Sequence, residues 1–168
     1  IRAISELIYN YHCTAVLCTA TQPALKDFFP DFMKAEEICP NVKGQYEFFK
    51  RTEVINIGEI SEEDLISYLE EKDQVLCVLN SRKRVQRVFE SLKGEDVYHL
   101  STYMYPAHRR RILKEITERL KDGRACKLIA TSLVEAGVDF DFASVFRELA
   151  GIDSVIQAAG RCNREGNR

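Results

Sequence analysis

The stretch QVLCVLN (residues 74–80) decides the fold, because it is an unbroken apolar run of strand length. A strand that is apolar on both faces is typical of a parallel sheet with helices on both sides. A helix is predicted directly after it, from about Arg82 to Leu92, because apolar side chains recur there at the spacing of one helix face: Val85, Val88, Phe89 and Leu92. The stretch and its neighbour therefore predict one strand–helix unit of an α/β fold.

The same alternation of strand and helix extends to both sides of this stretch. Further strands are predicted at 53–57 (EVINI), 96–101 (DVYHLS), 126–132 (CKLIATS) and 144–149 (SVFREL). Helices are predicted after Ser61, which is followed by three acidic residues, and from about Pro106 to Lys121. Strands separated by helices of this length predict an α/β fold with a mostly parallel sheet and helices on both faces.

The first fifty residues follow a different pattern. ISELIYNY favours a helix and TAVLCTAT (14–21) a single buried strand, while residues 39–52 have no clear period. One helix and one strand do not make a domain. We therefore expect residues 1–38 to be the remnant of a preceding domain, 39–52 a linker and 53–168 a second domain.

Composition and charge exclude several classes of protein. The chain has 168 residues, 45% of them hydrophobic, and a net charge of −2, so no global basic field attracts nucleic acid. Six cysteines without C-x-x-C spacing, some inside apolar runs such as VLCVLN and AVLCTA, predict buried thiols of a reducing compartment. No apolar run is long enough to span a bilayer, so we expect a cytoplasmic protein without a membrane partner.

Small polar side chains follow the predicted strands where each strand ends. The carboxyl ends of parallel strands are where open α/β sheets bind ligands. The residues are Thr19 and Thr21, Asn80 and Ser81, Ser101 and Thr102, and Thr131 and Ser132. Each cluster alone is also what helix capping requires. Four clusters on one edge, with the basic runs 82–87 and 109–111 nearby, favour a row that holds the phosphates of a single strand, although such basic runs are also common on solvated helix faces.

The stretch QAAGRCNREG (157–166) carries a second candidate site. Gln157, Arg161 and Arg164 stand at i, i+4 and i+7, so a continuous helix with Asp153 as its N-cap would place them on one face. Two guanidinium groups on one face suit a phosphate or carboxylate. Upstream, Gly137 permits close backbone approach, and Asp139 is an acceptor for a sugar hydroxyl or an arginine.

No general base or metal site is predicted. The three histidines, His12, His99 and His108, have no partner close in sequence, and His108 is placed to lean on the core. The cysteines show no C-x-x-C spacing, so they do not point to a metal site either.

The order of these stretches resembles the second half of a superfamily-two helicase. TAT (19–21) resembles motif III, VLCVLNSRKRV motif IV, ATSLVEAGVDFDF (130–142) motif V, and QAAGRCNREG motif VI. The resemblance implies a RecA-like second domain over 53–168, preceded by the remnant of the first RecA-like domain.

Two stretches resemble one particular family of these helicases. HLSTYMYPAHRRRIL (99–113) and GRCNREG are similar to the forms that these regions take in the CRISPR-associated helicase-nuclease of type I systems. This implies a prokaryotic ATP-dependent single-stranded-DNA translocase and nuclease in antiviral defence, working with an RNA-guided surveillance complex. The alternatives are a general superfamily-two DNA or RNA helicase and, from a different class, a non-catalytic α/β binding module.

The resemblance also implies a role for each candidate residue. Arg161 and Arg164 would reach the γ-phosphate of ATP, with Gln157 oriented near it. Gly137 and Asp139 would lie beside the nucleotide. The backbone of the DNA strand would contact Asn80, Ser81, Ser101, Thr102, Thr131 and Ser132. Thr19 and Thr21 would couple the two helicase domains.

The family's phosphate loop, its acidic Mg²⁺ motif and a His-Asp dipeptide do not occur in the sequence. ATP and Mg²⁺ would accordingly be held mainly by the first domain. We expect these 168 residues alone to bind no cofactor and to catalyse no reaction.

Overall fold

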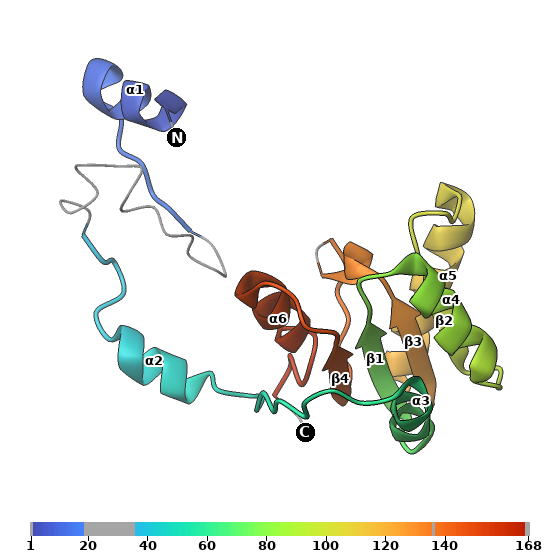
Figure 1. Ribbon diagram of the computed structural model, residues 1–168. Coiled ribbons are helices and arrows are strands. Elements are labelled where there is room, and N and C mark those ends of the chain that lie inside the picture. The colour runs from blue at the N-terminus through green and yellow to red at the C-terminus, as the bar shows by residue number, and fades with distance from the viewer. Residues whose placement is uncertain (1, 19–35, 136, 167–168) are drawn as a thin grey trace. The chain divides into compact units, whose positions relative to one another are not determined.

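A computed structural model describes residues 2–18, 36–135 and 137–166 (Figure 1). These residues divide into two compact units, 1–49 and 50–168. Among the described residues, no helix is both long and apolar enough to cross a membrane.

In the described residues of the first unit lie the helices α1 (Arg2–Tyr11) and α2 (Val42–Phe48). The Asn41 side chain caps α2 by accepting a hydrogen bond from the Gly44 N–H at 3.0 Å. Residues 14–18 form no strand and are exposed, so the predicted buried strand is wrong there. All six cysteines are free, but the prediction of buried thiols is correct only for Cys77 and Cys126. Cys13 and Cys18 are exposed, and Cys39 and Cys162 are partly exposed.

The second unit is built on four parallel strands in the order β2–β3–β1–β4. They are β1 (Gln74–Val78), β2 (Val97–Leu100), β3 (Cys126–Ala130) and β4 (Ser144–Arg147). The register pairs Leu100 with Ala130, Ala130 with Val78 and Val78 with Arg147. The four strands therefore end level with one another, and the loops that follow them leave the sheet at one edge.

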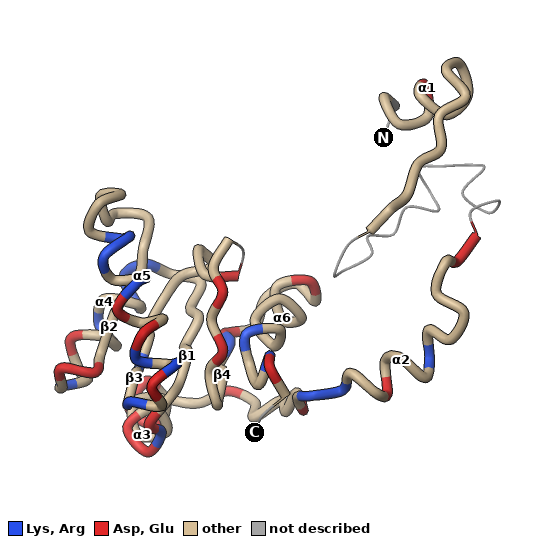
Figure 2. Tube along the Cα trace, turned by 180° about the vertical axis from the view of Figure 1, so that it is seen from behind, with Lys and Arg blue, Asp and Glu red and all other residues tan. Residues whose placement is uncertain are grey.

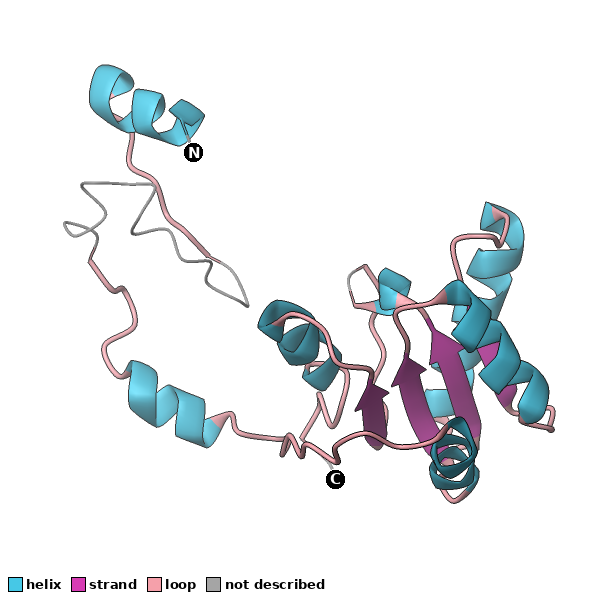
Figure 3. Cartoon of the chain, viewed as in Figure 1, coloured by secondary structure: helices cyan, strands magenta, loops and turns pink. Residues whose placement is uncertain are grey.

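Helices cover both faces of this sheet, as the apolar strand QVLCVLN predicts. Val75, Cys77 and Leu79 pack on one face with α3 (Glu62–Glu70) and α4 (Arg82–Ser91). Leu76 and Val78 pack on the other face with α5 (Pro106–Lys121). Figure 3 shows the strands in magenta between these helical layers. The α/β class with a parallel sheet is thus confirmed.

Residues 53–57 do not form the predicted strand. The segment is irregular, and Val54, Ile55 and Ile57 are exposed. A strand exists only where its backbone hydrogen bonds find a neighbour, and no strand pairing involves these residues. The β-branched composition that suggested a strand is a weak signal without that neighbour.

The helix α6 (Ile152–Ala159) is shorter than predicted and has Gly151, not Asp153, at its N-cap. Arg161 and Arg164 lie beyond its end, so they do not share a helix face with Gln157. The chain leaves the helix at Gly160 because it pairs with the segment after β3: Phe142 N–H donates to the Arg161 carbonyl at 2.9 Å, and Asn163 N–H to the Phe142 carbonyl at 3.0 Å. Asn163 adopts φ 45°, a left-handed conformation that α-helices exclude.

Candidate functional site

Three of the predicted polar clusters meet at the carboxyl edge of the sheet. Ser101 and Thr102 follow β2, Thr131 and the one-turn helix η2 (Ser132–Val134) follow β3, and Asn80 and Ser81 follow β1. Among these residues Asn80, Thr102 and Ser132 are exposed and Ser81 is half-buried, while Ser101 and Thr131 are buried. A ligand laid along this edge would meet the exposed side chains first.

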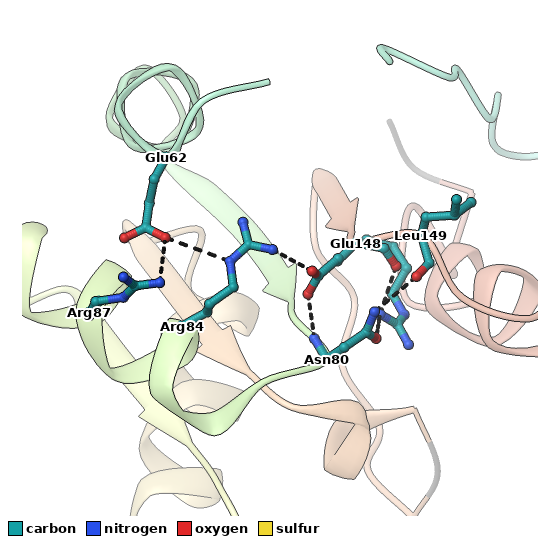
Figure 4. A network of polar contacts seen from close by, with 7 residues as sticks. Glu62, Asn80, Arg84, Arg87, Glu148 and Leu149 are labelled. Carbon is teal, nitrogen blue, oxygen red and sulfur yellow. Dashed lines mark hydrogen bonds and ion pairs between the residues drawn. The ribbon is translucent and has the colours of Figure 1, made fainter. Parts of the chain in front are cut away.

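The Asn80 side chain ties the end of β1 to the end of β4. Its Nδ2 donates to the Leu149 carbonyl at 2.9 Å, and its Oδ1 accepts from Arg147 Nη1 at 2.6 Å. The Asn80 backbone N–H donates to Glu148 Oε2 at 2.6 Å (Figure 4). The amide is therefore engaged within the domain, and a phosphate would have to share or displace these partners.

Ion pairs continue from Glu148 across to α3. Arg84 Nη1 pairs with Glu148 Oε1, and Arg84 Nε lies 3.6 Å from Glu62 Oε2. Arg87 Nη2 lies 3.2 Å from the same Glu62 oxygen (Figure 4). Part of the basic run 82–87 is thus neutralised by acidic neighbours, and Figure 2 shows basic and acidic stretches alternating along the second unit.

A second set of contacts leads from Arg147 to Arg161. Arg147 Nε lies 2.8 Å from Glu135 Oε1, and both side chains are less than one-tenth exposed. Arg161 Nη2 donates to the backbone carbonyl of Glu135 at 2.8 Å. The guanidinium group of Arg161 is thereby held beside the loop that follows β3.

Arg164 is held by the same region of the chain. Its Nη1 pairs with Asp139 Oδ1, and its backbone N–H donates to Asp141 Oδ1 at 2.7 Å. Gly137, two residues before Asp139, has φ 75°, which suits glycine. The loops that carry Gly137, Asp139, Arg161 and Arg164 are therefore brought together, although not by the helix face that the spacing suggested. Gln157 is exposed on α6.

The electrostatics of the two arginines favour an anion. Burial lowers the pKa of the Arg161 guanidinium, and the positive charge of Arg164 lowers it further, while Asp139 acts in the opposite direction. A negative group beside Arg161 opposes both of these effects, as the Asp139 carboxylate does. A phosphate oxygen is a suitable group because guanidinium forks bind it in bidentate geometry.

No metal centre accompanies this anion site in the described part of the chain, where no three His, Cys, Asp or Glu side chains gather to hold an ion. A Mg²⁺ ion would need carboxylates from elsewhere.

Thr19 and Thr21 lie outside the described residues.

Sequence reasoning missed Glu135, Arg147 and Glu148. The available signal was a pair of charges inside the otherwise apolar strand SVFREL. A charged side chain within a covered sheet needs a partner of opposite charge, because burying it alone is costly. The partner in space, Glu135, lies 12 positions earlier than Arg147 and could not be identified from spacing.

The chain is similar in sequence to a known protein family and to two members of it. Residues 71–167 match the family described as CRISPR-associated nuclease/helicase Cas3, C-terminal. The chain is 48% identical to the CRISPR-associated nuclease/helicase Cas3 of Haloferax volcanii over 61 residues, 36% of this chain and 6% of that protein. It is 32% identical to the protein of the same name from Methanothermobacter thermautotrophicus over 108 residues, 64% of this chain and 12% of that protein.

A solved structure shows the same fold. The crystal structure of T. fusca Cas3 with ATP superposes with a TM-score of 0.54 and 25% identity, over 66% of this chain and 15% of that one. The chain thus spans a small fraction of the length of the proteins that it matches.

Proposed function

The chain belongs to the CRISPR-associated nuclease/helicase Cas3 C-terminal family, as the second RecA-like domain of a Cas3-like helicase, and from this we propose how it works. It acts as part of a longer ATP-dependent single-stranded-DNA translocase and nuclease, which we call the longer protein. In that protein Arg161 and Arg164 complete an ATP site whose phosphate loop and Mg²⁺ carboxylate belong to another domain. The carboxyl edge of the sheet holds the DNA backbone.

One observation carries the proposal: the two loops with Arg161, Arg164, Gly137 and Asp139 converge beside the edge where the strands end. Arg161 bonds to the Glu135 carbonyl and Arg164 pairs with Asp139. Through the Glu135–Arg147 pair this anion site is also connected to Asn80. This chain of contacts between the proposed nucleotide site and the proposed nucleic-acid edge supports coupling of ATP turnover to movement along a strand.

The chemistry assigned to the arginines is stabilisation of charge. In phosphoryl transfer, negative charge builds on the transferred group and the leaving oxygen, and a guanidinium group supplied across a cleft stabilises it. Bound Mg·ATP would supply the reacting phosphates. The residues of this chain would orient the γ-phosphate and stabilise the charge that builds on it during transfer. Arg164 would first have to leave Asp139, which is an exposed partner and therefore a weak one.

The proposed partner and compartment rest on the family to which the chain belongs. The relatives are named CRISPR-associated, which supports work in prokaryotic antiviral defence with an RNA-guided surveillance complex that delivers the DNA. Such a complex acts in the cytoplasm, and we assign the longer protein to that compartment.

An assay of the longer protein tests the proposal. Phosphate release from ATP is measured with and without single-stranded DNA, and DNA degradation is followed in the same samples. We expect turnover that depends on both Mg²⁺ and DNA, and degradation that depends on ATP. Turnover that is indifferent to nucleic acid, or absent under all conditions, would contradict the proposal.

A further inference from the structure

The loop between β2 and α5 leaves two large aromatic rings in solvent. Tyr103 and Tyr105 are 76% and 66% exposed, although they lie only three and five residues after the buried Leu100 at the end of β2. Met104 between them packs against the core, and its N–H donates to the Ser101 carbonyl at 3.3 Å. The inward methionine anchors the loop, so the tyrosines on either side of it are displayed outward and not buried.

A cation is fixed over one of these rings. Arg82, the first residue of α4, places its Cζ 4.1 Å from the centroid of the Tyr103 ring. The Arg82 Nη1 also lies 3.4 Å from the Thr102 Oγ1, to which it donates. Three groups from the start of α4 and the loop after β2 therefore gather at one point: a guanidinium, an aromatic ring and a hydroxyl.

Tyr105 has different surroundings. Its ring contacts the ring of His108 on the first turn of α5, at 5.5 Å between centroids. It has no arginine over its ring among the contacts that the structure describes. Tyr105 is thus a neighbour of Tyr103 with similar exposure but without the cation.

The Tyr103 ring lies at the carboxyl edge of the sheet. Leu100, three residues before Tyr103, is in register with Ala130, which precedes Thr131 and Ser132. A strand whose phosphates follow the exposed hydroxyls of Thr102 and Ser132 would bring its bases within reach of this ring. Aromatic rings and guanidinium planes are the groups on which unpaired bases stack.

We propose that Arg82 and Tyr103 form a base-stacking site, on which one base of the bound single-stranded DNA lies against the tyrosine ring. The inference rests on the proposed DNA-binding function. In that proposal the protein contacts only the phosphates of the strand, and the stacking site adds a contact to a base. Stacking does not select a particular base, because every base has a π-face. The site therefore adds affinity for any sequence and distinguishes DNA with bases from a bare sugar–phosphate backbone.

The test uses two oligonucleotides of equal length, one of thymidines and one of abasic tetrahydrofuran units. Their affinities for the longer protein are measured by fluorescence anisotropy. Tyr103→Ala should weaken binding of the thymidine strand by about 5-fold to about 150-fold, the range for loss of one stacked base. It should leave the abasic strand unchanged. Tyr103→Phe keeps the ring and should bind both strands as the unaltered protein does.

Tyr105→Ala is the matched control, and it should leave both affinities near their original values. Equal loss on both strands, no loss on either, or the same selective loss in Tyr105→Ala would overturn the stacking site. Loss of binding to a protein partner with DNA affinity intact would also overturn it, since Tyr103 would then belong to a protein interface. If the unaltered protein binds neither strand, the proposed function fails; if it binds both and only the Tyr103 result is negative, that function stands without the stacking site.

Discussion

Arg147 Nε lies 2.8 Å from Glu135 Oε1, and the two side chains are 8% and 7% exposed. The pair joins the loop after β3 to the end of β4, and Arg147 reaches Asn80 with a second nitrogen. It is therefore the point where the candidate anion site and the candidate DNA edge meet.

Removing one member of this pair should destabilise the fold. Arg147→Met leaves the Glu135 carboxylate buried without its cation, a situation that costs about 3–5 kcal/mol in folded proteins. Glu135→Leu together with Arg147→Met removes both charges and should recover most of the loss. Urea unfolding of the chain followed by circular dichroism measures the free energies. A double variant no more stable than the single one would show that the contact does not act as a pair.

Stability should also depend on His99, whose pKa burial lowers below the usual 6.5, with a smaller contribution from His108. Above pH 6.5 the imidazole is neutral in both the folded and the unfolded chain, so its protonation removes no unfolding free energy there. As the pH falls, the unfolded chain takes up the proton first, so stability is lost as the pH falls toward and through the lower folded pKa.

Unfolding free energies at about pH 7.5 and about pH 5.5 bracket an ordinary histidine and test this expectation. His99→Gln should reduce the difference between the two values. His12→Gln, at an exposed site, should leave it unchanged. A pH dependence that survives in His99→Gln would assign the effect to another group.

Thiol labelling should separate the cysteines by burial. Burial raises the pKa of Cys77 and of Cys126 to about 12, so neither provides appreciable thiolate near neutral pH. Cys13 and Cys18 are exposed. Mass spectrometry after brief treatment with iodoacetamide should find the exposed pair modified and the buried pair intact until urea is added. Early modification of Cys77 would contradict the packing of β1 against α3 and α4.

The exposed hydroxyls of the edge should bind phosphate without regard to sequence. Thr102→Val with Ser132→Ala should weaken binding of single-stranded DNA by the longer protein to the same extent for oligo-dT, oligo-dA and oligo-dC, since phosphates carry no sequence information. Titrations at several salt concentrations give the affinities. A loss confined to one base would show that these residues read bases.

The elements from α3 onward were largely predictable because local signals agreed with the packing. The Ser61 Oγ accepts from the Asp64 N–H at 3.0 Å, as the cap in the sequence predicts. The unbroken apolar β1 is buried along its whole length between two helical layers. The alignment of Asn80, Ser101 and Thr131 at one edge followed from parallel strands ending level.

What could not be predicted depends on contacts distant in sequence. The end of α6 is set by pairing of Arg161–Asn163 with Phe142, which overrides the i, i+4, i+7 spacing. The helix α2 has no buried residue, so it has no apolar period to reveal it. The ion pairs of Glu148 with Arg84 and of Arg147 with Glu135 join residues whose positions only the fold brings together.

The central claim, that this domain supplies arginines to an ATP site, is tested most directly on Arg164 in the longer protein. Its exposed side chain pairs with Asp139, so Arg164→Ala should leave the melting temperature nearly unchanged. The affinity for a non-hydrolysable ATP analogue should also change little, because the arginine stabilises charge that develops only in the transition state. DNA-stimulated ATP turnover should fall by on the order of 10³-fold, as when a comparable arginine is lost in phosphoryl transfer. Arg124→Ala, which removes an arginine of similar exposure that pairs with the exposed Asp122 just before β3, is the control. Turnover by Arg164→Ala equal to that of the control would contradict the account.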